Sequence, residues 1–226
     1  MSTCLAMIKA RLPSGPASLL FLSIVSGFIS ITPLSADSAA ADSLLVVGDS
    51  LSAGYGLSDS GQGWVALLQQ RLQPRNITVV NASIPGDTSG GGLARLPAAL
   101  AAHHPRIVIL ELGANDGLRG LPPAALKANL GAMIDQARSA GAQVLLLGMK
   151  LPPNYGGRYA EAFERVYQEL AEEKQVRLLP FFLDGVAGDE HLLQSDGLHP
   201  NAEAQPLLMK SVFEKLEPLL VSIDRP

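Results

Sequence analysis

Short, wholly apolar runs alternate with longer amphipathic segments along most of this chain, and that alternation limits the folds open to it. A strand with one solvent-exposed face would alternate polar and apolar side chains, so unbroken apolar runs are typical of strands buried on both faces. Strands of this kind, separated by helices, predict a parallel sheet that is covered on both sides and joined by right-handed crossovers. We therefore expect an α/β domain of three layers.

The pattern predicts five strands and a set of helices between them. The strands are expected at residues 44–48, 77–81, 107–113, 143–148 and 176–179. Apolar side chains at helical spacing predict helices over residues 64–72, 93–102, 124–140, 159–170 and 208–220. Ligands of open parallel sheets bind beyond the carboxyl ends of the strands. We therefore expect the chemistry in the loops that follow these five strands.

The first forty residues differ from the rest and are typical of a secretory signal peptide. A basic start, a mostly apolar stretch over residues 17–31 and a run of small residues follow one another. Ser38 and Ala40 suit a cleavage site, which predicts removal of residues 1–40 and a single mature domain over residues 41–226. The alternative is an uncleaved anchor, for which the apolar stretch is short against roughly 30 Å of hydrocarbon. We expect a periplasmic or secreted protein without stable membrane insertion after cleavage.

The composition excludes several classes of protein. With 47% hydrophobic and 17% charged residues among 226, the chain can bury a core without a metal or a disulfide staple. A net charge of −4 argues against a nucleic-acid partner, which normally meets a basic face. Cys4 is the only cysteine, so an intrachain disulfide, a zinc finger and an iron–sulfur cluster are excluded. The composition leaves the oligomeric state open.

Polar, glycine-bearing segments fall where the chemistry is expected. GDSLSAGYG follows the first strand, NASIPGDTSGGG the second and GANDGLRG the third, and SDGLHPNAEAQ lies near the C-terminus. Ser50 is a candidate nucleophile, which needs a base and a group that orients the base. His199, with Asp196 three residues before it, fits that need, although Asp196 taken alone fits a helix cap equally well. The remaining histidines are expected to be exposed: His103, His104 and His191.

Acyl transfer through a serine also needs donors for the oxyanion of the tetrahedral intermediate. Gly86 is a candidate because a residue without a side chain lets its backbone approach a substrate closely. Asn115 is a second candidate because it offers a side-chain NH2 group. Each also fits an ordinary role in a turn or a cap.

Taken together, the four segments resemble the SGNH (GDSL) hydrolase superfamily, and the resemblance covers essentially all of the mature chain. GDSLSAGYG, NASIPGDTS, GLARLP, GANDGLRG, LPPNYGGRY and DGLHPNAEAQP are similar to the small bacterial periplasmic group of thioesterases, arylesterases and lysophospholipases. The resemblance implies a flavodoxin-like sheet, a catalytic triad and no cofactor. One position departs from the pattern, because Pro85 stands where a serine is more usual.

The resemblance also assigns roles to residues of this chain. It makes Ser50 the nucleophile, His199 the base and Asp196 the residue that orients the base. The Ser50 N–H, Gly86 and the Asn115 side chain become the oxyanion donors. The implied reaction is hydrolysis of acyl esters and thioesters through an acyl-enzyme, and the implied partners are small acyl-ester, thioester or lysophospholipid substrates.

The sequence also bears on several alternative functions. An α/β-hydrolase elbow needs G-x-S-x-G, which the GDSLS string does not provide, and the phosphate-cradling glycine motifs are absent from the sequence. A metal-dependent phosphoesterase would use hard ligands drawn from Asp49, Asp87, Asp116, Asp196 and His199. A periplasmic binding module is a further alternative. Within the superfamily, the main alternative is a carbohydrate O-acetylesterase.

The loops after the third and fourth strands are expected to hold the acyl chain. They supply apolar surface without an acidic side chain, and we single out Leu118, Pro153 and Tyr155 as substrate-binding residues. Because each buried methylene is worth about 0.8 kcal/mol, this surface predicts a preference for medium to long acyl chains.

Overall fold

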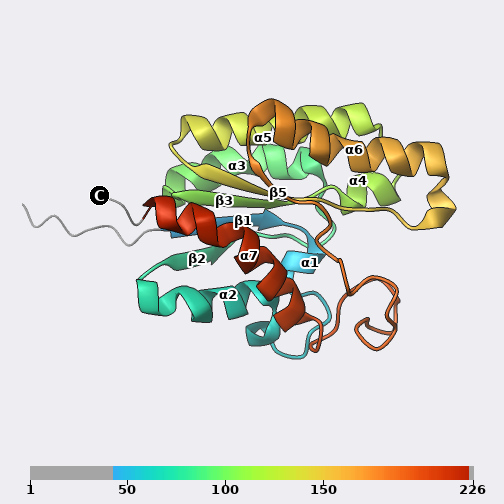
Figure 1. Ribbon diagram of the computed structural model, residues 1–226, viewed down its shortest axis with the longest axis horizontal. Coiled ribbons are helices and arrows are strands. Elements are labelled where there is room, and N and C mark those ends of the chain that lie inside the picture. The colour runs from blue at the N-terminus through green and yellow to red at the C-terminus, as the bar shows by residue number, and fades with distance from the viewer. Residues whose placement is uncertain (1–42, 224–226) are drawn as a thin grey trace, which may run out of the picture. The chain divides into compact units, whose positions relative to one another are not determined.

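The computed structural model describes residues 43–223, so the predicted signal peptide lies outside the described residues. The sheet consists of β1 (Ser43–Gly48), β2 (Thr78–Asn81), β3 (Ile107–Glu111), β4 (Gln143–Leu147) and β5 (Arg177–Leu179). Its order is β2-β1-β3-β4-β5, and all four neighbouring pairs are parallel (Figure 1). This is the flavodoxin-like order, so the expected fold class is confirmed.

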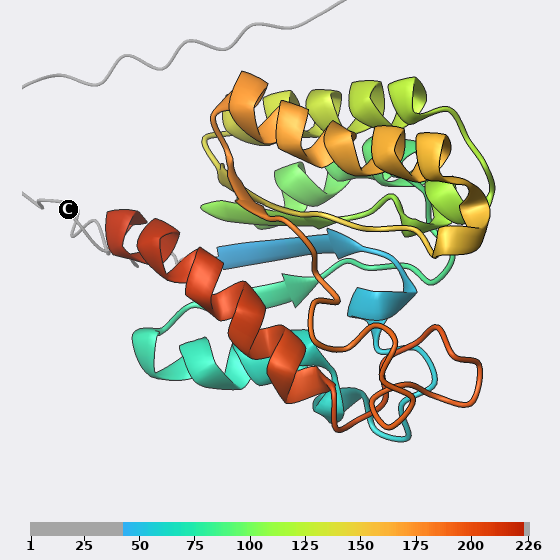
Figure 2. The same ribbon diagram turned by 45° about the vertical axis from the view of Figure 1, so that its right-hand side comes forward.

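Helices cover both faces of the sheet (Figures 1 and 2). One layer holds α3 (Ser89–His103), α5 (Pro123–Ser139) and α6 (Gly157–Lys174), and the other holds α2 (Trp64–Leu72) and α7 (Gln205–Ile223). Single turns of 3-10 helix occur at η1 (Ser60–Gln62), η2 (Gln73–Arg75) and η3 (Pro153–Tyr155). None of the helices within residues 43–223 is long and apolar enough to cross a membrane.

Two short helices, α1 (Ser50–Ala53) and α4 (Ala114–Leu118), were not expected from the sequence. Each is about one turn long, which is too short to show a hydrophobic period. Helix α3 also begins four residues before the expected position 93, because the Thr88 side chain accepts the Gly91 N–H at 3.3 Å and caps its first turn. These three helix starts lie in the segments that follow β1, β2 and β3, where the site was expected.

The buried strands of the sheet fix the geometry of that edge. Strands β1, β3 and β4 are almost wholly buried, which explains their unbroken apolar runs. The register of β1 and β3 places Gly48 beside Glu111, so the two strands end level with each other. The strand order reverses between these two strands, and ligands bind at such a switch point in folds of this kind.

Candidate active site

Ser50 is held at the end of a rigid strand by a sharp change of backbone direction. Asp49 leaves β1 in a non-helical conformation, and its side chain accepts the Leu51 N–H at 3.0 Å, which caps α1. Ser50 is therefore the first residue of a helical turn, and its N–H has no acceptor inside that helix. Both the hydroxyl and the N–H of Ser50 are presented at the sheet edge.

The structure brings Ser50, His199 and Asp196 together. His199 Nε2 lies 2.9 Å from Ser50 Oγ, and His199 Nδ1 lies 2.6 Å from Asp196 Oδ2. His199 packs on one side against Tyr55, with ring centroids 4.8 Å apart. The contact chain from hydroxyl to imidazole to carboxylate is the geometry that a nucleophile, a base and an orienting acid require.

The loop that carries Asp196 and His199 closes on itself through the backbone. Asp196 Oδ1 accepts the N–H groups of Leu198 at 2.9 Å and of His199 at 3.0 Å. Gly197 takes a φ of +67°, a left-handed conformation that glycine adopts without steric cost. The two backbone N–H groups and the imidazole lower the pKa of Asp196 to about 2, so this carboxylate is ionised at neutral pH. The three-residue spacing thus sets the orientation of the imidazole locally.

Gly86 lies in a tight turn beside Ser50. The turn runs from Ile84 to Asp87 and is closed by the Asp87 N–H, which donates to the Ile84 carbonyl at 3.1 Å. Gly86 has a φ of +77°, and proline followed by such a glycine is the favoured pair at the centre of a type II turn. Pro85, the residue that departs from the superfamily pattern, therefore suits the turn that presents Gly86.

Asn115 lies on the first turn of α4. Its Nδ2 donates to Asp49 Oδ2 at 3.0 Å and to the Asp87 carbonyl at 2.9 Å. Both hydrogens of the amide have acceptors, so donation to an oxyanion requires that one of these bonds be shared or exchanged. Asn115 nevertheless lines the same cavity as Ser50 and Gly86, and the three sequence-predicted donors converge there.

Two buried carboxylates lie beneath Ser50. Asp49 and Glu111 are both fully buried, and Glu111 Oε2 accepts the Asp49 N–H at 3.2 Å and the Ser52 hydroxyl at 2.6 Å. Burial raises the pKa of Asp49 to about 6, against the opposing bonds from Leu51 and Asn115. Burial and the neighbouring Asp49 raise the pKa of Glu111 well above its ordinary value. A side chain at Gly48 would place its Cβ 2.6 Å from Glu111 Oε2, so only glycine fits there.

A cavity of about 960 Å³ opens from Ser50 and His199. Its wall is mostly apolar and comes from the segments after β4 and β5: Met149, Leu151, Pro152, Phe181, Leu183, Ala187 and Leu193. Leu118 also lines it, as expected. Tyr155 is not among the lining residues, and its hydroxyl instead donates to the Leu118 carbonyl at 3.4 Å. Pro153 begins η3, but its side chain lies outside the described residues.

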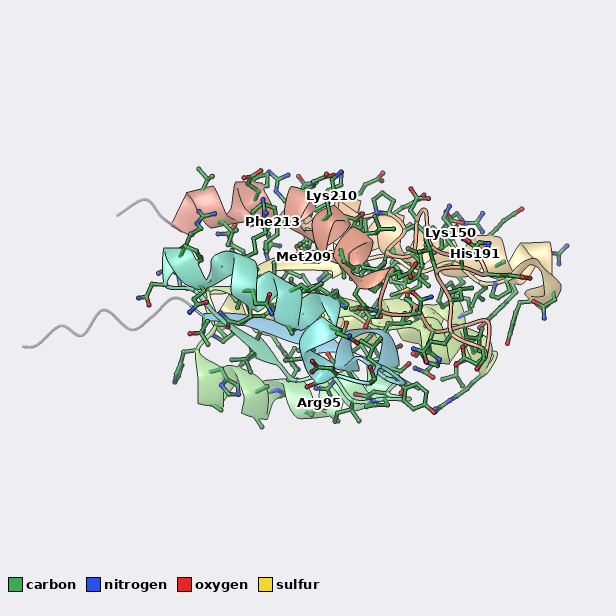
Figure 3. The ribbon with its side chains drawn as sticks, turned by 90° about the horizontal axis from the view of Figure 1, so that it is seen from below. Arg95, Lys150, His191, Met209, Lys210 and Phe213 are labelled. Atoms are coloured by element: carbon green, nitrogen blue, oxygen red, sulfur yellow. The ribbon has the colours of Figure 1, made fainter. Side chains whose placement is uncertain are left out.

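The remaining candidates lie away from this cluster. His103, His104 and His191 are exposed, as expected from the sequence, and Figure 3 labels His191 on the segment after β5. The part of the chain that the structure describes contains no group of three or more His, Cys, Asp or Glu side chains that could hold a metal ion.

Comparison with known proteins identifies the family to which this arrangement belongs. Residues 46–206 match the model of the GDSL-like Lipase/Acylhydrolase family. The chain belongs to this family. The resemblance seen in the motifs is thus confirmed over most of the described residues.

Relatives of this GDSL-like hydrolase match along nearly their full length. Esterase TesA from Pseudomonas aeruginosa is 56% identical over 199 residues, covering 87% of this chain and 98% of the relative. A protein from Escherichia coli strain K12 named thioesterase 1/protease 1/lysophospholipase L1 is 48% identical over 193 residues, covering 85% and 92%. A crystal structure of TesA superimposes with a TM-score of 0.76 at 58% identity, covering 79% of this chain and 99% of that one. These matches make the chain an enzyme, a carboxylic ester hydrolase of the serine esterase type.

Sequence reasoning did not find every group that shapes the site of this GDSL-like hydrolase. Glu111 was not singled out from the sequence. A glutamate at the end of an apolar strand is nevertheless a signal of a buried carboxylate with polar partners, because carboxylates are almost never buried without them. Arg95, which bonds the backbone around Ser50 and Gly86, also went unremarked. The segment after β5 was not expected to form a wall of the cavity, because its fold is irregular and its side chains show no periodicity.

Proposed function

We propose that this GDSL-like hydrolase cleaves acyl esters and thioesters with Ser50 as nucleophile, His199 as general base and Asp196 as the residue that orients the imidazole. The contact chain Ser50 Oγ–His199 Nε2–Asp196 at the mouth of a mostly apolar cavity is the observation that carries the proposal. The names of the relatives, which include esterase, thioesterase and lysophospholipase, support this range of substrates.

The first half of the reaction forms an acyl-enzyme. His199 Nε2 takes the proton of Ser50 Oγ as that oxygen attacks the acyl carbonyl, and the ionised Asp196 stabilises the imidazolium that results. The carbonyl oxygen becomes an oxyanion, which the N–H groups of Ser50 and Gly86 and the amide of Asn115 receive. The imidazolium then protonates the departing alcohol or thiol.

The second half returns the enzyme to its starting state. A water molecule takes the place of the leaving group, His199 removes its proton, and the resulting hydroxide attacks the acyl-enzyme. The same three donors hold the second oxyanion. As this intermediate collapses, the bond between the acyl carbon and Ser50 Oγ breaks and the imidazolium of His199 returns its proton to Oγ, which releases the carboxylic acid and restores the Ser50 hydroxyl.

The shape of the cavity supports a medium or long acyl chain. From Ser50 it extends along the apolar wall formed after β4 and β5, and Leu151, Phe181 and Leu183 are among its lining residues. Each methylene that leaves water for such a wall contributes about 0.8 kcal/mol. We therefore propose that acyl chains of roughly six to twelve carbons react faster than the acetyl group.

A panel of matched esters tests this substrate class. The value of kcat/KM for p-nitrophenyl esters and acyl-CoA thioesters of increasing chain length should rise until the cavity is full, with longer chains exceeding acetyl by at least about tenfold. Phe181→Ala should reduce this preference and leave acetyl-ester hydrolysis unchanged. A preference for acetyl esters, above all acetylated sugars, would favour the carbohydrate O-acetylesterase instead.

We also propose that the mature enzyme is exported and acts in the periplasm or outside the cell. The signal-like pattern before residue 41 supports this location. The mass of the protein purified from the periplasmic fraction should correspond to residues 41–226. Recovery of the full-length chain from the membrane fraction would favour the uncleaved anchor.

A further inference from the structure

Arg95, which Figure 3 labels, belongs to helix α3, and its guanidinium contacts two segments of the site. Its Nε donates to Asp87 Oδ2 at 2.7 Å, its Nη2 donates to the Gly48 carbonyl at 3.2 Å, and its Nη1 donates to the Ala82 carbonyl. The side chain is only 21% exposed, and that of Asp87 is 12% exposed. One guanidinium thus satisfies three acceptors in a largely buried position.

The three acceptors belong to the two backbone segments that present Ser50 and Gly86. Gly48 ends β1 two residues before Ser50, and it also accepts the Ile84 N–H at 3.0 Å. Ala82 precedes the turn that contains Gly86, and Asp87 is the last residue of that turn. Arg95 therefore fixes the separation of the nucleophile segment and the Gly86 turn.

The third proposed oxyanion donor is connected to the same cation. The carbonyl of Asp87 accepts the amide of Asn115 at 2.9 Å, while the carboxylate of Asp87 accepts Arg95 Nε. Asp87 thereby links Arg95 to the side chain of Asn115. A displacement of Arg95 would move all three donors relative to one another.

The chemistry of this junction requires an arginine. The guanidinium presents five donors in a fixed plane, whereas a lysine ammonium is a point charge that cannot reach three separated acceptors with the same geometry. Gly91, one helical turn before Arg95, leaves room for the Asp87 carboxylate, because a Cβ there would lie 1.8 Å from Asp87 Oδ1. Residues four apart lie on one helix face, so Gly91 and Arg95 together form the surface of α3 that contacts the Asp87 carboxylate.

We propose that Arg95 is a positioning residue of the oxyanion hole, which acts by holding the Gly48–Ser50 segment, the Gly86 turn and Asn115 in register. The inference rests on the proposed roles of Ser50, Gly86 and Asn115. Arg95 is not among the residues that line the cavity, so it acts through the groups that it holds. Its contribution is expressed in the transition state, where donor placement decides how well the charged oxygen is held.

The first test separates kcat from KM. A misplacement of about 1 Å at a reacting centre can cost roughly 100-fold in rate. Arg95→Gln should therefore lower kcat by about 10- to 100-fold and change KM by less than about threefold, and Arg95→Lys should restore little of the loss. Arg71→Gln is the matched control, because Arg71 lies over the Phe213 ring at 4.0 Å on another part of the surface, and it should leave kcat unchanged.

A second test moves Asp87 without altering Arg95. The new Cβ in Gly91→Ala would displace the Asp87 carboxylate from its position beside α3. This variant should lower kcat, as Arg95→Gln does, and leave KM unchanged. This variant also keeps the inference testable if Arg95→Gln fails to fold.

A third test restores the missing guanidinium from solution. Arg95→Gly should have a lowered kcat, and millimolar guanidinium chloride, but not sodium chloride, should raise it again.

The decisive readout is the affinity for two inhibitors. An alkylboronic acid forms a tetrahedral adduct on Ser50 and uses the oxyanion donors, whereas a fatty acid product fills only the cavity. In the Arg95 and Gly91 variants the boronate affinity should fall in parallel with kcat, and the fatty acid affinity should not change. Equal loss of both affinities, or an unchanged kcat in a folded Arg95→Gln enzyme, would overturn the inference. If Ser50→Ala and Asn115→Ala also left activity intact, the proposed function itself would be wrong.

Discussion

Replacement of Asn115 by alanine tests how the oxyanion is stabilised. In the structure this amide donates to Asp49 Oδ2 and to the Asp87 carbonyl, and it faces the cavity at Ser50. Loss of one oxyanion donor costs about 2.7–4 kcal/mol of transition-state stabilisation, which is a fall of roughly 10²–10³ in kcat. KM should change little, because the donor bonds the oxygen best once it is charged.

The same change should also destabilise the fold by an amount that the structure sets. Asp49 is fully buried and loses a donor, which costs about 1–3 kcal/mol in free energy of unfolding. The bond from Asn115 lowers the pKa of Asp49, so its removal raises that pKa further above the value of about 6. Urea unfolding at two pH values and steady-state hydrolysis of a p-nitrophenyl ester measure the two effects separately.

Asn129→Ala is the matched control, because Asn129 donates to Ser89 Oγ at 3.0 Å and lines no part of the cavity. It should keep kcat within about twofold of the parent enzyme, because the bond that it removes ends at Ser89, which does not line the cavity either. If Asn115→Ala raised KM and left kcat unchanged, the amide would be a ground-state contact, and its role as an oxyanion donor would be refuted.

Three further outcomes follow from the charges of the site. Because the pKa of Glu111 is raised in the folded state, the contribution of this group to stability is fully present below the pH at which an unfolded glutamate titrates, about 4.3, and is lost as pH rises. The urea midpoint of Glu111→Gln should therefore decline less than that of the parent enzyme between about pH 5 and 8. The pKa of Asp196 near 2 keeps it ionised above about pH 4, so Asp196→Asn should lower kcat by up to roughly 10⁴ at every assay pH, and a loss confined to acidic pH would contradict the triad. Activity should survive EDTA, and inactivation by chelator would favour the metal-dependent phosphoesterase.

The sequence contained enough to predict the fold and the place of the site. Strands such as β1 and β3 are buried on both faces, and their apolar runs are a local signal of that environment. The Asp196–His199 pair was also visible, because a three-residue spacing in one loop places the carboxylate on the imidazole without help from the rest of the chain.

Contacts between distant segments could not be predicted in the same way. Arg95 reaches Gly48 and Ala82 only because α3 packs beside the ends of β1 and β2, and no spacing in the sequence encodes that approach. The path of the segment after β5 likewise depends on packing, so Phe181 and Leu183 were not recognised as cavity wall while Tyr155 was expected there. The unpredicted parts are thus those that depend on tertiary structure.

Covalent labelling of Ser50 tests the central claim most directly. A fluorophosphonate should modify this serine and no other, and peptide mass spectrometry after digestion should place the adduct on Ser50. Ser50→Ala should abolish labelling and lower kcat by roughly 10⁴–10⁶. An adduct at another residue, or hydrolysis that persists in Ser50→Ala at the parent rate, would contradict the account.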